Sequence, residues 1–120
     1  MLLHLVDDEK IINRTIDSFE EALPGRNIFL CFADLPTKYV RPRYNLYFIG
    51  DSTISENICK WEINAIIIHY LSYKKIVFLQ KNFYPKVPIY WMMWGRDFYN
   101  NLLYSRGFPL YYKFHWPGLK

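Results

Sequence analysis

The sequence has few cysteines, few chain-breaking residues and no long apolar run, and each of these shortages excludes a class of protein. The two cysteines, Cys31 and Cys59, fit neither a zinc site nor a disulfide framework by their spacing. Gly and Pro number 5 and 7 in 120 residues and are scattered, which excludes low-complexity chains. No apolar run approaches the roughly 20 residues of a membrane-spanning helix. The acids at 7–9 interrupt the N-terminal apolar run, so no secretory signal is predicted. We therefore expect a reduced, cytoplasmic protein.

Acidic residues are scarce in the second part of the chain. Residues 1–40 carry 4 basic and 7 acidic side chains, whereas residues 41–120 carry 11 basic and 4 acidic ones, and the only acid after Ile63 is Asp97. A basic half rich in aromatic residues suits an anionic partner such as lipid head groups, a pyrophosphate or nucleic acid. A solvated basic face without a partner is the alternative.

Several lysines of this basic half flank apolar residues, namely Lys74, Lys75, Lys81 and Lys86. Such a pattern is typical of a protein that lies on an anionic membrane surface. The aromatic tail over 104–120 has a second interpretation, because it can also pack on another domain. Both interpretations stay open at the level of sequence.

What the chain does contain is material for a core, with 52% hydrophobic and 20% aromatic residues. Apolar segments of strand length alternate with segments of helical period, a pattern that predicts a parallel sheet. The fold class is therefore α/β, a single Rossmann-like domain over 1–120 with about five parallel strands and helices on both faces. The predicted strands are 2–6, 27–33, 44–50, 65–71 and 89–94. The predicted helices are 7–25, 55–61, 73–84 and one that begins near Asp97.

Helical spacing also predicts which side chains are buried. In the first helix the stripe is Ile12, Ile16, Phe19 and Leu23, and in the third it is Ile76, Leu79 and Phe83. Asp7 or Asp8 can cap the first helix, and Pro24-Gly25 ends it. Both cysteines fall in apolar surroundings, so we expect core thiols.

Ligands of open parallel sheets bind at the carboxyl ends of the strands. In this sequence those ends carry reactive or polar groups. They are Asp7, Asp8, Asp34, Asp51, His69 and the segment GRDFYN over 95–100.

The groups at the strand ends can be compared with the motifs of two common classes of α/β domain. The acids Asp7 and Asp8 after a first strand resemble those of a phosphorylation receiver domain, but no later strand ends in Lys-Pro and the phosphoacceptor context is absent. A dinucleotide-binding domain needs a glycine-rich first turn, and the sequence has VDDEK there. A non-catalytic receiver-like or protein-interaction module is kept as the alternative function.

The segment IYWMMWGRDFYN over 89–100 is similar to the motif W-G-x-D-x-Y of one glycosyltransferase family, the TDP-N-acetylfucosamine:lipid II N-acetylfucosaminyltransferases. Trp94, Gly95, Asp97 and Tyr99 occupy the fixed positions of that motif. Two further stretches resemble the family in the same order: NRT with FEEAL in the first helix, and a fourth strand that ends in His69. Arg96, Met92 and the loop at 34–43 depart from the pattern.

The resemblance implies a GT-B glycosyltransferase, of which this chain would be the acceptor-side N-terminal domain. It implies a second, C-terminal domain that binds a nucleotide sugar as donor substrate, and a polyprenyl-pyrophosphate-linked glycan as acceptor. No metal or other cofactor and no nucleic-acid partner is expected. The location would be cytoplasmic, at the cytoplasmic face of the inner membrane, and the 120-residue chain alone would be inactive.

The same resemblance implies site residues, each with a structural alternative. Asp97 would be the general base or an acceptor-binding group, or else a helix cap, and His69 would be a second catalytic residue or a satisfied buried histidine. The acceptor-binding candidates are Asn13, Arg14, Gly95, Arg96 and Tyr99. His4, inside the first strand, is expected to be structural, and the three histidines have no metal spacing.

Overall fold

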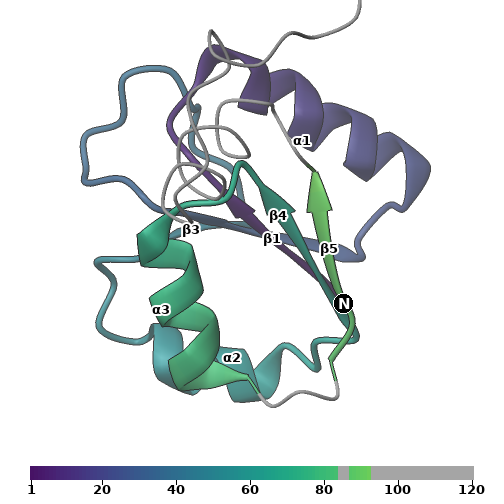
Figure 1. The fold of residues 1–120 in the computed structure, drawn as a ribbon. Helices are drawn as coiled ribbons and strands as arrows, with labels where there is room; N and C mark the ends of the chain where they lie inside the picture. The colour runs from purple at the N-terminus through teal and green to yellow at the C-terminus, as the bar shows by residue number, and fades with distance from the viewer. Residues whose placement is uncertain (84–86, 93–120) are drawn as a thin grey trace, which may run out of the picture.

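A computed structural model describes residues 1–83 and 87–92 of the chain. Five strands form one sheet in the order β3-β2-β1-β4-β5, and every neighbouring pair is parallel (Figure 1). The predicted fold class, a Rossmann-like α/β domain, is confirmed. The strands are β1 (Leu2–Val6), β2 (Asn27–Cys31), β3 (Leu46–Phe48), β4 (Ala65–His69) and β5 (Ile89–Met92).

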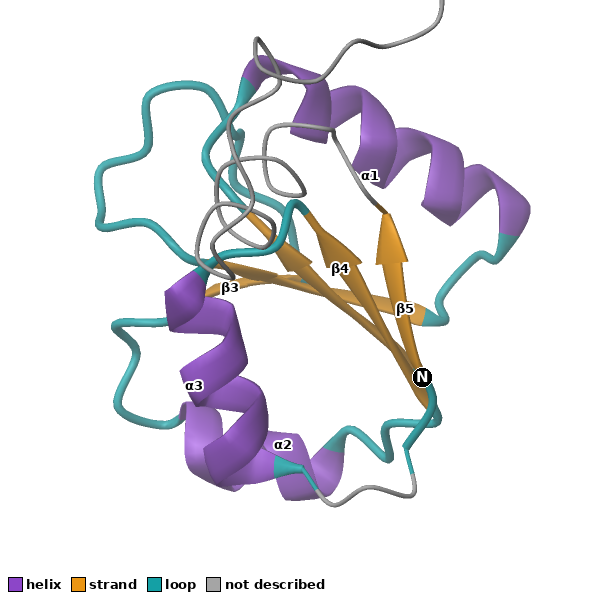
Figure 2. Cartoon of the chain, in the orientation of Figure 1, coloured by secondary structure: helices purple, strands orange, loops and turns teal. Residues whose placement is uncertain are grey.

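In the part of the chain that the structure describes, three helices cover the two faces of this sheet, α1 on one side and α2 and α3 on the other (Figure 2). The helices are α1 (Lys10–Ala22), α2 (Ile54–Lys60) and α3 (Tyr73–Asn82). The last predicted helix, near Asp97, lies outside the described residues. None of the helices in the described part is long and apolar enough to cross a membrane.

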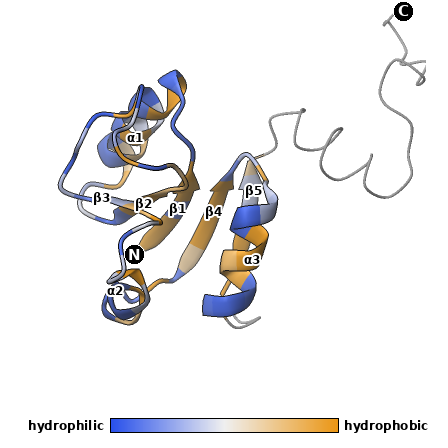
Figure 3. Ribbon diagram, turned by 90° about the vertical axis from the view of Figure 1, so that its left-hand side faces the viewer, coloured by the Kyte–Doolittle hydropathy of each residue, from blue (hydrophilic) through white to orange (hydrophobic). Residues whose placement is uncertain are grey.

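The core consists of two apolar layers, because successive side chains of a strand point to opposite faces. Leu3 and Leu5 of β1 pack with the α2 and α3 side, whereas His4 and Val6 face α1. Every residue of β2 is buried, as expected for a strand covered on both faces. In Figure 3, β1 and β4 are coloured as hydrophobic, and α1 carries much of the hydrophilic colour.

The helix boundaries correct one prediction about capping. Helix α1 begins after Glu9, and no side chain caps it. Asp7 and Asp8 make other contacts, described below, because both lie where the chain crosses the end of the sheet. Gly25 has a φ of 70°, a left-handed conformation that suits glycine, and the turn there ends the helix as predicted.

Three predicted core positions are wrong, for local reasons. Leu23 is 41% exposed because it is the C-cap residue and lies beyond the last turn of α1. Ile76 of α3 is 38% exposed, and Lys75 and Phe78 are buried instead. Cys59 of α2 is exposed, while Cys31 is buried as predicted.

Candidate functional site

The strand order places a topological switch point between β1 and β4. The chain adds β2 and then β3 on one side of β1 and returns to add β4 on the other. Ligands of open α/β sheets bind outside the carboxyl ends of the strands at such a point. In this chain the residues that follow the two strands are Asp7 after β1 and Tyr70 after β4.

A fully buried lysine from α3 joins these two strand ends. The ammonium of Lys75 donates to Asp7 Oδ2 (2.5 Å) and to the carbonyl oxygens of His69 (2.7 Å) and Tyr70 (2.6 Å). The Lys75 side chain is 0% exposed and that of Asp7 is 27% exposed. Tyr70 has a φ of 69°, and a non-glycine residue in this region costs on the order of 1 kcal/mol. The bond from Lys75 to its carbonyl helps to hold that conformation.

This finding corrects the membrane interpretation for Lys75. An ammonium with no exposed surface cannot contact lipid head groups, whereas Lys74 and Lys81 are exposed. The spacing offered a signal, because Lys75 lies three and four residues before Phe78 and Leu79 on the inner face of α3. Lys86 lies outside the described residues.

Asp8 holds the segment 34–43 against the start of α1. Its carboxylate accepts hydrogen bonds from the backbone N–H groups of Lys38 (2.5 Å), Tyr39 (2.9 Å) and Val40 (2.9 Å). Desolvation raises the pKa of Asp8, but these three bonds outweigh it and the net pKa is lowered. The segment therefore depends on an ionised carboxylate.

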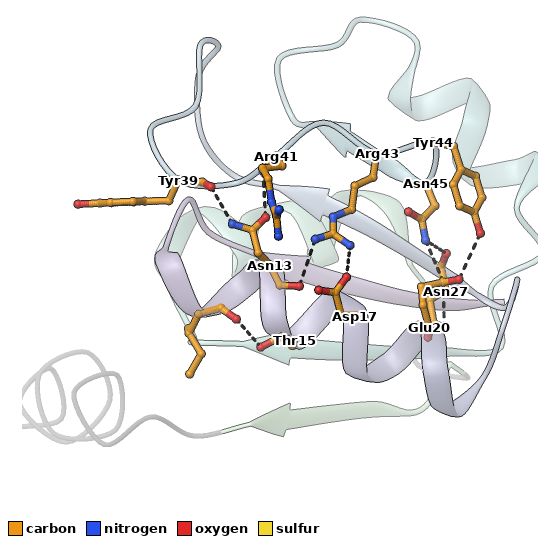
Figure 4. Close-up of polar contacts among 11 residues, drawn as sticks. Asn13, Thr15, Asp17, Glu20, Asn27, Tyr39, Arg41, Arg43, Tyr44 and Asn45 are labelled. Carbon is orange, nitrogen blue, oxygen red and sulfur yellow. Dashed lines mark hydrogen bonds and ion pairs between the residues drawn. The ribbon is translucent and has the colours of Figure 1, made fainter.

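Asn13 of α1 anchors the same segment further along (Figure 4). Its Nδ2 donates to the carbonyl of Tyr39 (2.7 Å), and its Oδ1 accepts from the N–H of Arg41 (3.0 Å). Arg43 forms an ion pair with Asp17 of α1. The segment 34–43 is thus tied to α1 at two further points.

A buried hydrogen-bonded chain of three side chains lies between the sheet and α1. Asn27 Oδ1 is 2.9 Å from His4 Nε2, and His4 Nδ1 is 2.9 Å from His69 Nε2. The Asn27 amide nitrogen donates to the carbonyls of Phe19 and Leu23, so its oxygen must accept from His4. His4 therefore carries its proton on Nε2 and accepts from His69, which also carries its proton on Nε2.

His4 and His69, the two histidines of this hydrogen-bonded network, are neutral. Burial lowers the pKa of His4 to about 4, against the smaller opposing effects of Asn27 and Glu20. Burial, followed by the repulsion that a protonated His69 would meet from a protonated His4 and from Lys75, lowers the pKa of His69 to about 3. The structural role predicted for His4 is confirmed.

The predicted site residues that the structure describes take different positions. His69 is 1% exposed, and its Nε2 is engaged with His4, so its ring does not face the edge where a substrate would bind. Asn13 is half-buried and its side chain is committed to the segment 34–43. Arg14 is exposed on α1. Gly95, Arg96, Asp97 and Tyr99 lie outside the described residues.

A cavity lies at the carboxyl ends of β2 and β3. Its volume is about 510 Å³, within the range of small-molecule sites. Asp34 and Asp51 are its charged lining residues. The others are Ala33, Leu35, Leu46, Tyr47, Phe48 and Gly50.

The strand order and the contacts of the acids can be compared with those of a receiver domain. Receivers of the flavodoxin-like class have the order 2-1-3-4-5, whereas β3 is the edge strand in this sheet. Asp7 bonds to Lys75 and Asp8 to backbone amides, so the two carboxylates do not converge on one ion. Within residues 1–83 and 87–92 no group of three or more His, Cys, Asp or Glu side chains could hold a metal.

Comparisons with protein-family models, with curated proteins and with solved structures gave no match.

Proposed function

We propose that this chain is the acceptor-binding domain of a GT-B glycosyltransferase that moves a sugar from a nucleotide-sugar donor to a polyprenyl-pyrophosphate-linked glycan. The proposal rests on the position at which β5 ends. β5 runs parallel to β4, which runs parallel to β1, so Met92 lies at the same edge of the sheet as Asp7. The W-G-x-D-x-Y motif begins two residues later in the sequence.

The fold supports the proposal but does not carry it alone, because one fold hosts many functions. A Rossmann-like sheet offers its carboxyl edge as one wall of a crevice, and glycosyl transfer between two substrates suits a crevice with two walls. The second wall would be a nucleotide-sugar-binding domain. The donor sugar in the resembled family is TDP-N-acetylfucosamine, and we propose a donor of this type.

The roles follow from the chemistry of transfer. An acceptor hydroxyl must lose a proton as it attacks, and the proposal gives this step to the carboxylate of Asp97. The Nε2 of His69 is hydrogen-bonded to His4 and does not contact a substrate, so the proposal gives the buried ring of His69 a structural role. Exposed Arg14 can contact an acceptor phosphate, and Gly95, Arg96 and Tyr99 remain acceptor-binding candidates from the motif.

The direct test is transfer by the natural gene product that contains this chain. Purified protein would be incubated with labelled TDP-sugars and a short-chain polyprenyl-pyrophosphate disaccharide, and the products would be separated by chromatography. Because general acid–base catalysis contributes about 10²–10⁴-fold, Asp97→Ala should reduce kcat by at least about 100-fold. Glu21→Ala is the matched control, since Glu21 is exposed near the far end of α1.

Two results would overturn the proposal. One is a wild-type protein that transfers no sugar to any lipid-linked acceptor from a panel of nucleotide sugars. The other is an Asp97→Ala protein that turns over at the wild-type rate. A folded but inactive Asp97→Ala protein, with Glu21→Ala fully active, would support it.

A further inference from the structure

The cavity at the ends of β2 and β3 has a character different from the rest of the carboxyl edge. Asp34 comes from the segment after β2, and Asp51 from the turn after β3. Among residues 1–83 and 87–92, no lysine, arginine or histidine lines this cavity. Two carboxylates without a nearby lining cation repel phosphate and carboxylate groups, and they accept hydrogen bonds from hydroxyl or ammonium groups.

The two carboxylates differ in their hydrogen bonds to the rest of the protein. Asp51 Oδ1 accepts from the N–H (2.9 Å) and hydroxyl (2.7 Å) of Thr53, so that atom is occupied and the carboxylate is fixed in place. In the described part of the chain, Asp34 has no hydrogen bond or ion pair from its side chain, and it is exposed. The cavity thus has one fixed acceptor and one available acceptor.

The wall between them is an edge strand with apolar and aromatic side chains. Among the strands that the structure describes, β3 pairs with β2 alone, and an edge strand offers backbone groups to other partners. Leu46, Tyr47 and Phe48 of β3 line the cavity together with Leu35. A sugar ring has the matching surface, with hydroxyls that donate and accept around its rim and C–H groups on its faces.

We propose that this cavity binds one neutral or amino-bearing sugar ring, and that Asp34 and Asp51 accept hydrogen bonds from its hydroxyl or ammonium groups. A carboxylate after the second strand holds ribose hydroxyls in dinucleotide-binding sheets, which shows that the position suits such a contact. The two lining carboxylates disfavour a phosphate, so the proposed ligand is a sugar without a phosphate at this point. That the sugar belongs to a glycosyl acceptor rests on the proposed function.

The experiment measures sugar binding by the 120-residue chain, without donor or transfer. Methyl α-D-glucopyranoside, glucosamine and glucose 1-phosphate would each be titrated into the ¹⁵N-labelled protein, and amide shifts and saturation transfer would be recorded. We expect the neutral glycoside and the amino sugar to shift the amides of 33–35 and 46–51. The phosphorylated sugar should bind at least about tenfold more weakly, because the lining carboxylates repel it.

Two variants test the cavity without testing the fold. Asp34→Asn keeps the shape of the side chain and removes its charge, and it should raise the Kd about tenfold or more. Gly50→Leu places a large side chain at a lining position and should weaken binding, and the fold should tolerate it because a Cβ added at Gly50 meets no atom within 4 Å and the residue does not have a positive φ. Glu56→Gln, on the exposed side of α2, is the matched control and should bind like the wild type.

The outcomes separate this proposal from the glycosyltransferase proposal. Binding that is weakened in Asp34→Asn and Gly50→Leu but kept in Glu56→Gln supports the sugar site, even if the natural gene product transfers nothing. Absence of binding by all three sugars at 50 mM or more, or tightest binding of glucose 1-phosphate, overturns it. An active transferase whose KM for the acceptor is unchanged by Gly50→Leu would also overturn it while leaving the proposed function standing.

Discussion

Replacing His69 by glutamine tests whether the buried histidine pair is neutral in the folded chain. Glutamine Nε2 can replace the ring Nε2 as donor to His4 Nδ1, so the hydrogen bond is kept and one titrating group is removed. The pKa of His4 falls from 6.5 to about 4 on folding, and that of His69 to about 3. Between these values and 6.5 the unfolded chain binds protons that the folded chain does not, so the free energy of unfolding falls as pH falls.

The size of this loss follows from the number of protons. Each neutral histidine lowers the free energy of unfolding by up to about 1.4 kcal/mol per pH unit. From pH 7 to pH 5, with an unfolded pKa of 6.5, the loss is about 2 kcal/mol for each histidine and about 4 kcal/mol for the pair. Asp8, Asp17 and Asp51 have pKa values lowered below 3.8, so they stay ionised in both states over this range.

Urea unfolding at pH 7, 6 and 5, followed by tryptophan fluorescence, measures the effect. The His69→Gln protein should lose about 2 kcal/mol where the wild type loses about 4. His115→Gln is the matched control, because it removes the third histidine, which lies outside the described residues, and keeps the buried pair. It should retain the loss of about 4 kcal/mol. Equal losses in His69→Gln and His115→Gln would refute the neutral pair.

Two further predictions concern the contacts at the edge of the sheet. Lys75→Met leaves Asp7 without its buried partner and should lower the free energy of unfolding by about 3–5 kcal/mol, whereas Lys74→Met, on the exposed face, should change it by less than about 0.5 kcal/mol. Urea unfolding at pH 7 compares them, and a loss below about 1 kcal/mol for Lys75→Met would contradict the description. Asp8→Ala removes the acceptor for the amides of 38–40, so their hydrogen exchange should speed up at least about tenfold. Unchanged exchange at those amides would show that Asp8 does not hold the segment.

The sequence predicted the elements well because each strand is an apolar run between polar or chain-breaking residues. The predicted strand 2–6 coincides with β1. The predictions 27–33 and 65–71 extend two residues past β2 and β4, since apolar character continues after the ladder ends. Ala33 and Leu71 still pack against the core from the loops.

The strand order and the buried lysine could not be predicted in the same way. A parallel sheet follows from local patterns, but the order of its strands depends on which crossovers pack, and those contacts join distant parts of the chain. Lys75 is buried because its acceptors come from Asp7 and from the end of β4, 68 and 5–6 residues away. A lysine pattern alone indicates a solvated or lipid-facing side chain.

For the candidate site, the sequence predicted only its location, at the carboxyl edge of the sheet. Acids after the first three strands were correctly expected at the carboxyl ends, yet their tasks differ in the structure. Asp7 joins two strands to α3 and Asp8 fixes a loop, while Asp34 and Asp51 line a cavity. Local sequence does not show which carboxylates form hydrogen bonds or ion pairs within the fold.

The segment 34–43 has a consequence for how an elongated substrate would be oriented. Its charge changes sign along ten residues, from Asp34 at one end to Lys38 and Arg41 towards the other, while Arg43 is paired with Asp17. A molecule with a hydroxylated head and a phosphate tail would be attracted when its head lies near Asp34 and its phosphate near the basic residues. In the reversed orientation its phosphate would lie near Asp34 and be repelled. A single loop would thereby select which way round such a molecule lies.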